Sequence, residues 1–157
     1  MYIEVLNKRQ NDFCKIIFDV LENLHEDTVI ELKKIFEKNY IEKTYEAIKD
    51  YEIHVIKLNN DMPVGLFGVI PFQFKTAGIF LLTTKNLAYG NKIKFLREAK
   101  KIVKKWEVQY ELLMDSCYKK NEKIKKWLLL LGFVPSKYED ENFQIYYKGN
   151  IELYEGL

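Results

Sequence analysis

Basic side chains gather in the second half of this chain, and their number suggests a site for an anion. Between Lys85 and Lys126 there are 13 Lys and Arg residues against 5 Asp and Glu residues, a local balance of +8. The remainder of the chain holds 12 against 18, a balance of −6. A field of one sign favours an anionic partner, such as a phosphorylated cofactor or a nucleic acid. The alternative is a set of solvated helix faces with no partner.

Three other side chains are candidates for acid–base chemistry. A general base must come within hydrogen-bond reach of the proton that it removes. His54 and Asp115 each lie in an expected strand, and Tyr118 stands at the end of the strand that contains Asp115. Each residue also has a structural interpretation: a half-buried histidine, a capping or surface carboxylate, and an aromatic ring at a rim.

The two cysteines, Cys14 and Cys117, lack the spacing of a metal site, and we expect no metal. Cys14 lies in a helical pattern and Cys117 at the end of a strand, so we expect buried free thiols and a reducing cytoplasm. The first residues lack the basic and apolar segments of a signal peptide. The longest apolar stretch is too short to span a bilayer, so we expect no membrane contact.

Hydrophobic periodicity predicts an alternation of strands and helices. Alternating or continuous apolar runs predict strands at 2–6, 51–58, 64–70, 76–84, 110–117, 133–138 and 143–148. Apolar residues at helical spacing predict helices at 13–24, 29–36, 40–48, 92–106 and 123–131. The segment 40–48 is either a third helix or a continuation of the second. Asn11 or Asp12 is the expected cap of the first helix. Residues 86–91, which include Gly90, are expected to form a loop.

The stretch Lys123–Phe133 carries the clearest local signal. An apolar helix ends on Gly132, where a left-handed residue without a Cβ is favoured, and Phe133 begins the next strand. A chain of 157 residues is a natural size for one core, so we expect a single α/β domain over 1–157.

This order of elements resembles the GNAT N-acetyltransferase superfamily over nearly the whole chain. Within it, four pieces resemble a phage family known as internal virion protein A. The pieces are Met62-Pro63-Val64-Gly65-Leu66-Phe67-Gly68-Val69, Leu81-Leu82-Thr83-Thr84, Phe95-Leu96-Arg97-Glu98-Ala99-Lys100 with Trp106 after it, and the run from Asn121 to Phe133. The resemblance implies a mixed, mostly antiparallel sheet of about seven strands, with splayed central strands and flanking helices.

The resemblance also implies a site for acetyl-CoA between the strands 76–84 and 110–117. Pantetheine would pair with main-chain groups near Leu82 and Thr83, and the pyrophosphate would lie over residues 86–92, where helix-start amides favour an anion. Lys85 and Lys94 would add to the positive field. The cofactor-binding residues implied in this way are Leu82, Thr83, Thr84, Gly90, Asn91, Lys92 and Asn121.

Two departures from the GNAT pattern bear on activity. The usual phosphate loop, "arg/gln-x-x-gly-x-gly/ala", is represented only by Gly90. Many GNAT enzymes place a tyrosine, the general acid for the thiolate, four residues before the glycine of Gly-Phe. Here that position is Leu128, so Tyr118 or a water would have to substitute.

Three functions follow as hypotheses. The first is transfer of an acetyl group to an amine of a protein or small molecule. The second is a GNAT-fold phage protein without catalysis, in the virion or its assembly, since a scaffold does not fix a function. The third is a host-directed binder, whose basic helix face 92–105 contacts a partner. Nucleic acid is the less favoured partner, and the sequence does not indicate the oligomeric state. We expect the protein in the bacterial host cytoplasm or in the virion.

Overall fold

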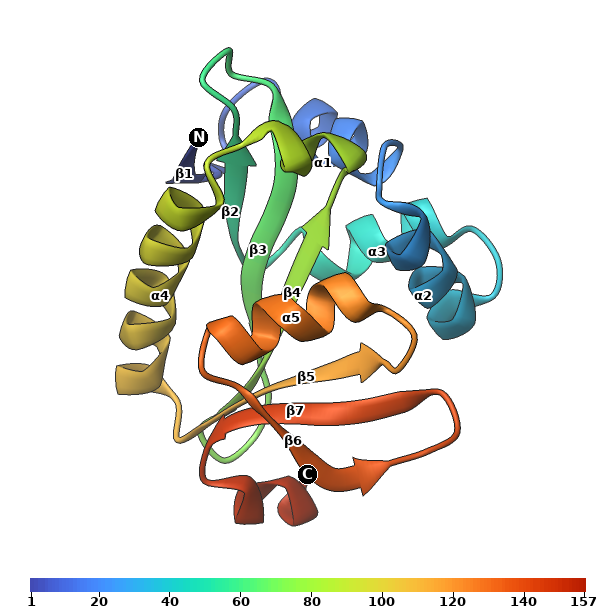
Figure 1. Cartoon of the computed structure of the whole chain (residues 1–157), viewed down its shortest axis with the longest axis vertical. Helices are drawn as coiled ribbons and strands as arrows, with labels where there is room; N and C mark the ends of the chain where they lie inside the picture. The colour runs from blue at the N-terminus through green and yellow to red at the C-terminus, as the bar shows by residue number, and fades with distance from the viewer. The chain divides into compact units, whose positions relative to one another are not determined.

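The computed structural model describes all 157 residues and has an α/β fold with one mixed, seven-stranded sheet. The sheet order is β1-β2-β3-β4-β5-β7-β6 (Figure 1). The strands are β1 (Tyr2–Val5), β2 (Glu52–Lys57), β3 (Pro63–Pro71), β4 (Thr76–Thr83), β5 (Leu112–Tyr118), β6 (Val134–Glu139) and β7 (Phe143–Gly149). The fold class predicted from the sequence is confirmed.

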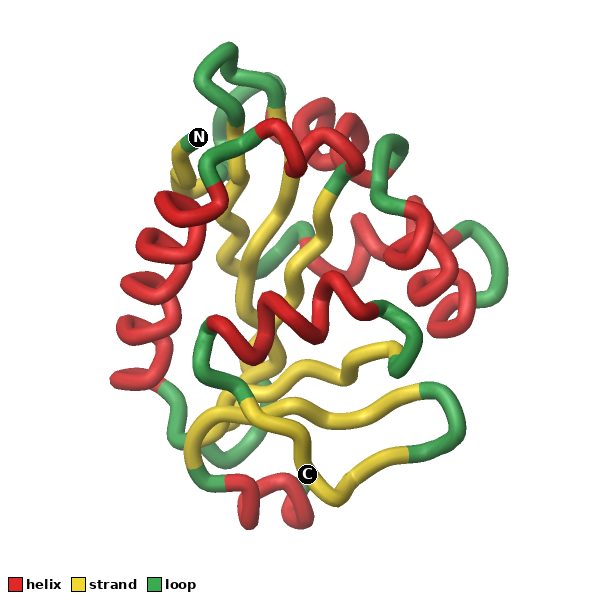
Figure 2. Tube along the Cα trace, viewed as in Figure 1, coloured by secondary structure: helices red, strands yellow, loops and turns green.

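Five α-helices and two 3-10 helices accompany the strands (Figure 2). They are α1 (Phe13–Leu21), α2 (Glu26–Phe36), α3 (Tyr40–Ile48), η1 (Lys85–Tyr89), α4 (Lys92–Gln109), α5 (Glu122–Leu130) and η2 (Ile151–Gly156). The predicted order of strands and α-helices is therefore correct. The two 3-10 helices were not predicted, and η1 occupies most of the expected loop 86–91.

The chain forms two compact units. The first comprises Met1–Gly68 and Phe80–Phe95, and the second comprises Val69–Ile79 and Leu96–Leu157. Strands β3 and β4 and helix α4 each run from one unit into the other. The single domain expected over residues 1–157 stays a prediction.

The first unit contains the three N-terminal helices and the antiparallel pair β1–β2. Helix α1 buries one stripe of five apolar residues, namely Phe13, Ile16, Ile17, Val20 and Leu21. Cys14 lies outside this stripe and is exposed, so its predicted burial was wrong, whereas Cys117 is buried as predicted. Asp12 holds the cap position of α1, but its side chain makes no capping hydrogen bond.

The break expected after Leu24 is the start of a new helix. His25 is the N-cap of α2, and its Nδ1 accepts a hydrogen bond from the Asp27 amide at 3.3 Å. Glu26 and Asp27 then lie in the first turn, where acidic side chains stabilise the positive end of the helix dipole. Polar residues that seemed to interrupt a helix therefore begin one.

In the second unit, β5 is the strand around which the others are arranged. It pairs antiparallel with β7, from Leu112 opposite Gly149 to Tyr118 opposite Phe143. Its parallel register with β4 joins Thr76–Gly78 to Leu112–Met114. That register covers three residues of each strand, as expected for central strands that splay.

The glycine predicted to end α5 does so. Gly132 has φ +94°, its amide donates to the Leu129 carbonyl at 3.1 Å, and the Phe133 amide donates to the Leu128 carbonyl at 2.9 Å. These two bonds form a Schellman motif, which satisfies carbonyls that the helix end leaves free. Leu128 and Phe133 are fully buried, so this turn also closes the apolar side of α5.

Candidate functional site

The end of β4 supplies the first group of predicted cofactor residues. Leu82, Thr83 and Thr84 are all buried. The Thr83 carbonyl accepts a hydrogen bond from the His25 amide at 2.9 Å, and the Thr84 amide donates to the Val64 carbonyl at 2.9 Å. These two main-chain groups therefore already have hydrogen-bond partners within the protein.

The Thr83 hydroxyl is an exception, because it is buried without a hydrogen-bond partner. A buried hydroxyl that has lost its water and gained no partner costs about 1–3 kcal/mol. The only other side-chain atom of this kind is the Thr44 hydroxyl on α3. An orphaned donor at the end of β4 is the sort of group that a ligand would satisfy.

Helix η1 changes the loop that the sequence suggested for a pyrophosphate. Thr84 caps it, with its hydroxyl accepting a bond from the Asn86 amide at 3.2 Å. The Leu87 amide donates to the Thr84 carbonyl, and the Gly90 amide donates to the Leu87 carbonyl. These amides point into their own helix, so η1 does not form an open phosphate cradle.

Gly90 has a packing reason to be glycine. Its backbone is extended, with φ −91° and ψ 168°, so no left-handed conformation requires it. A Cβ at this position would instead overlap the Met1 side chain. Met1 is buried, and its ammonium group donates to the Asn59 side chain. A cavity of about 560 Å³ adjoins this contact, lined by Met1, Leu58, Asn59, Asn60, Tyr89, Gly90 and Asn91.

The start of α4 is the part of this region that suits an anion. Asn91 caps the helix, with its Oδ1 accepting a bond from the Lys94 amide at 3.1 Å. The amides of Lys92 and Ile93 find no acceptor in the chain. The first turn has no acidic residue, whereas Lys92 and Lys94 are both exposed there. Positive side chains at the positive end of a helix dipole are unfavourable unless an anion is bound.

In the second unit, β5 and the turn after it hold three predicted residues. Asp115 is half-buried and lies opposite Tyr146 in the register. Tyr118 is buried, and its ring lies 5.8 Å from that of Phe143. The structural interpretation of Tyr118 as a rim aromatic was therefore wrong, because the residue is buried and its ring is close to that of Phe143.

Asn121 is fully buried and is the N-cap of α5. Its Oδ1 accepts a bond from the Ile124 amide at 3.4 Å, and its carbonyl accepts one from the Lys125 amide at 3.1 Å. Capping is a local role that the sequence could have indicated, since an asparagine precedes an apolar helix. A cofactor contact by its amide group would be an additional role.

His54 lies on β2 in the first unit and is buried. Its Nε2 lies 2.7 Å from a carboxylate oxygen of Glu52, two residues earlier on the same face of the strand. A carboxylate at this distance orients the imidazole ring through a hydrogen bond. The predicted half-buried histidine thus has an acidic partner that sequence spacing alone did not single out.

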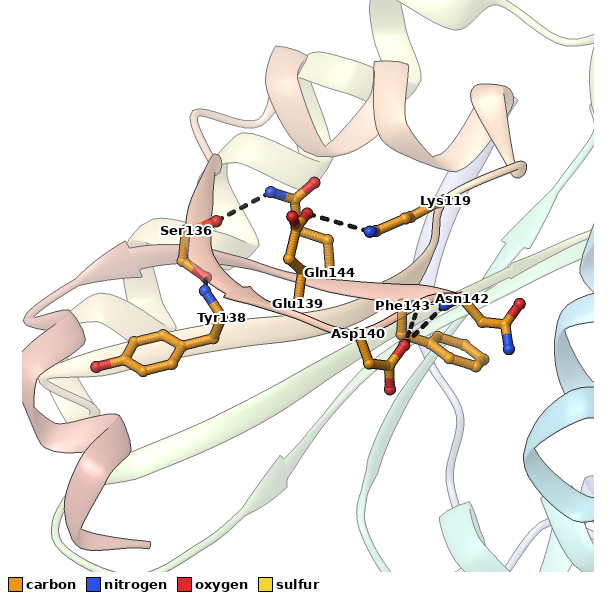
Figure 3. Close-up of polar contacts among 8 residues, drawn as sticks. All are labelled: Lys119, Ser136, Tyr138, Glu139, Asp140, Asn142, Phe143 and Gln144. Carbon is orange, nitrogen blue, oxygen red and sulfur yellow. Dashed lines mark hydrogen bonds and ion pairs between the residues drawn. The ribbon is translucent and has the colours of Figure 1, made fainter.

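The β6–β7 hairpin carries a network of polar contacts (Figure 3). Asp140 accepts the amides of Asn142 and Phe143 at 2.8 and 2.7 Å, and these hydrogen bonds hold the pKa of its carboxyl below the ordinary value. Lys119 and Glu139 form an ion pair at 3.2 Å. Asp140 therefore stays ionised down to a lower pH than an ordinary aspartate does.

A cavity of about 410 Å³ lies against this hairpin. Its lining combines charged and aromatic side chains with one serine and one isoleucine, from β5, β6, β7, η2 and the β6–β7 turn. The residues are Ser116, Lys137, Tyr138, Glu139, Asp140, Phe143, Ile145 and Tyr154. No three His, Cys, Asp or Glu side chains are arranged to bind a metal ion. No helix is both long and apolar enough to cross a membrane.

Comparison with solved structures identifies the fold. An acetyltransferase of the GNAT family from Staphylococcus aureus superposes with a TM-score of 0.62 at 12% identity, covering 94% of this chain and 98% of its own. An acetyltransferase from Streptococcus agalactiae gives 0.65 at 16% identity, covering 94% and 98%. A mutant spermidine N-acetyltransferase from Vibrio cholerae gives 0.60 at 12% identity, covering 97% and 96%.

The chain therefore has the fold of GNAT acetyltransferases. No family model matches the sequence, and no curated protein is similar to it in sequence. At these identities the comparison concerns the fold and leaves the activity of this chain to be argued from its own residues.

Proposed function

We propose that this chain is an acetyl-CoA-dependent N-acetyltransferase. The observation that carries the proposal is the start of α4, which follows the fourth strand of a GNAT fold and presents lysines and unpaired amides to an anion. A helix start of this kind stabilises phosphate groups. The wider fold correspondence, over 94% of the chain, supports the same conclusion.

The residues present fit the cofactor in two respects. Lys92 and the free amides that begin α4 would hold the pyrophosphate, with Asn91 fixing the helix start. The unpartnered Thr83 hydroxyl would gain a hydrogen bond from a bound pantetheine or acetyl group. Leu82, Thr84 and Gly90 would complete the site, and Asn121 stays a proposed cofactor contact. When bound, acetyl-CoA supplies an activated acetyl thioester.

Three residues are proposed for proton transfer. An amine attacks a carbonyl carbon only when it is unprotonated, so a base that removes its proton favours the reaction. His54, oriented by Glu52, and Asp115 are the proposed bases. Tyr118 is the proposed acid for the departing thiolate, because Leu128 cannot serve.

The acceptor is proposed to be an amine of a protein or a small molecule. Spermidine is a suitable first probe, because spermidine N-acetyltransferases are among the proteins that share this fold. We place the reaction in the host cytoplasm, in line with the phage resemblance of the sequence.

The experiment is a calorimetric titration of acetyl-CoA into three proteins. The Lys92→Glu/Lys94→Glu variant reverses the charge at the start of α4. The matched control, Lys8→Glu/Lys38→Glu, reverses two exposed lysines that have no ion-pair partner in the chain. Both variants change the net charge from +2 to −2. A Gly90 variant is avoided, because its Cβ would disturb Met1.

We expect acetyl-CoA to bind the wild type and the control with similar affinity. The Lys92→Glu/Lys94→Glu variant should bind at least about 10-fold more weakly, which corresponds to roughly 1.4 kcal/mol. No heat with the wild type at about 100 μM protein would contradict the proposal, as would equal weakening in both variants.

A second function is favoured by specific observations. Helix η1 uses its own amides, Gly90 packs on Met1, and Leu128 is buried where many GNAT enzymes have a tyrosine. These features suit a phage protein that keeps the GNAT fold without catalysis, either as an internal virion or assembly component or as a host-directed binder. Failure of acetyl-CoA to bind would favour this function.

A further inference from the structure

Helix α4 presents a cationic surface that extends well beyond the proposed cofactor site, which uses only the lysines of its first turn. Over Lys92–Gln109 it carries seven Lys or Arg residues and two Glu residues, a balance of +5 in a chain whose net charge is +2. Its apolar side is committed to the core, since Phe95, Ala99, Val103 and Trp106 are all buried. The basic residues lie on the opposite, exposed side.

The charges form a continuous stripe along the helix. Lys94, Arg97, Lys101 and Lys104 follow one another at intervals of three, four and three residues, which places them on one face. Lys105 lies beside them, and the stripe extends for about 16 Å at a rise of 1.5 Å per residue. We name these five residues the α4 stripe.

Most of the α4 stripe has no counter-charge in the protein. Glu98 pairs only with Lys101, at 3.4 Å between exposed side chains. Glu107, the other acidic residue of α4, pairs with Lys148 at 2.6 Å. Lys94, Arg97, Lys104 and Lys105 make no ion pair. Like charges this close repel one another, so a multivalent anion would relieve the repulsion.

We propose that the α4 stripe binds the phosphate backbone of a nucleic acid. Lysine and arginine supply most of the affinity for phosphates, and a regular row of cations suits a regular row of phosphates. The stripe has no aromatic residue and no apolar centre, and lysine is depleted in protein–protein interfaces. An acidic protein is therefore a poorer fit to this surface.

A membrane surface is also a poorer fit. Helices that lie on membranes insert an apolar face between the lipids, but the apolar face of α4 is buried in the core. The exposed apolar residues of α4, Ile93 and Val108, lie near opposite ends of the helix.

The proposal that the α4 stripe binds nucleic acid does not rest on acetyltransferase activity.

The test compares two variants of equal net charge. Arg97→Gln/Lys101→Gln/Lys104→Gln/Lys105→Gln removes most of the α4 stripe and leaves Lys92 and Lys94, which belong to the proposed cofactor site. Lys8→Gln/Lys38→Gln/Lys120→Gln/Lys126→Gln removes four exposed lysines outside α4. Both variants move the net charge from +2 to −2, and glutamine keeps helix propensity high. Circular dichroism is used to check that both variants are folded.

Fluorescence anisotropy measures binding to a labelled 20-base-pair DNA duplex, to the matching RNA duplex and to polyglutamate. We expect the wild type and the control to bind at least one duplex, with affinity falling about 10²-fold between 50 and 200 mM salt if about four phosphates are neutralised. The α4 variant should lose at least about 10-fold in affinity at 50 mM salt and most of the salt dependence.

Four results would overturn the inference. They are no binding of either duplex by the wild type at about 100 μM, equal losses in the two variants, binding that does not change with salt, and binding of polyglutamate as tight as that of the duplexes. The last result would assign the α4 stripe to an acidic protein. Acetyl-CoA binding by the α4 variant separates this inference from the proposed function, because its cofactor lysines are intact.

Discussion

At the scale of single residues, Thr83 gives the sharpest test of where a ligand binds. Its hydroxyl is buried without a partner, and so is that of Thr44. Replacing either residue with valine removes an unsatisfied group while nearly keeping the shape. We therefore expect Thr83→Val and Thr44→Val each to raise the free energy of unfolding by about 1 kcal/mol, as measured by urea denaturation.

The two variants should differ in ligand binding. Thr83→Val should weaken acetyl-CoA binding, because the ligand loses a hydrogen-bond partner, whereas Thr44→Val on α3 should leave it unchanged. A Thr83→Val protein that binds acetyl-CoA as tightly as the wild type would show that this hydroxyl has no role in the site.

Residue-scale predictions from the sequence succeeded where the cause was local. Gly132 was predicted because a helix end with a left-handed residue is visible within a few positions. The glycine at 90 suggested a phosphate loop, but its structural cause is Met1, which is far away in the sequence. The unpartnered Thr83 hydroxyl likewise depends on tertiary burial and left no sequence signal.

At the scale of elements, α4 combines a well-packed apolar side with an exposed side whose positive charges repel one another. Arg97 has Lys94, Lys100 and Lys101 as neighbours at helical spacings of three or four residues. Arg97→Glu turns three repulsive pairs into attractive ones, each worth about 0.2–0.5 kcal/mol. We expect it to raise the free energy of unfolding by about 1 kcal/mol at low salt.

The gain should shrink in 1 M NaCl, where the screening length is about 3 Å. Arg97→Gln is the control, and its free energy of unfolding should rise by about half as much. An Arg97→Glu protein less stable than the wild type at low salt would mean that the guanidinium group has a stabilising role. The expected gain would mean that α4 keeps its charge at the expense of stability, as functional surfaces often do.

Helices were predicted well when apolar residues at helical spacing marked one of their sides. The bounds of α3 agree with those expected, and α4 was recognised from its apolar side. Helix η1 was missed because a 3-10 turn needs few residues and has no periodic signature. Its cap, Thr84, was assigned to a strand because it follows a continuous apolar run.

At the scale of the whole molecule, the order of elements was sufficient to predict the fold. The order of strands and helices along the chain agrees with the GNAT arrangement. The solved GNAT structures match this fold over more than nine-tenths of the chain. The candidate site was less predictable, because its unpartnered hydroxyl and the packing around Gly90 arise from tertiary contacts. Gly90 illustrates this, since only the structure places its backbone against the Met1 side chain.

The central claim, that acetyl-CoA binds at the end of β4 and the start of α4, is tested most directly by an amide NMR titration of the wild type with acetyl-CoA. We predict saturable shifts for residues 82–84 and 90–94, with little change at the Asp140 turn of the β6–β7 hairpin. Shifts confined to other parts of the chain, or none at millimolar acetyl-CoA, would contradict the claim.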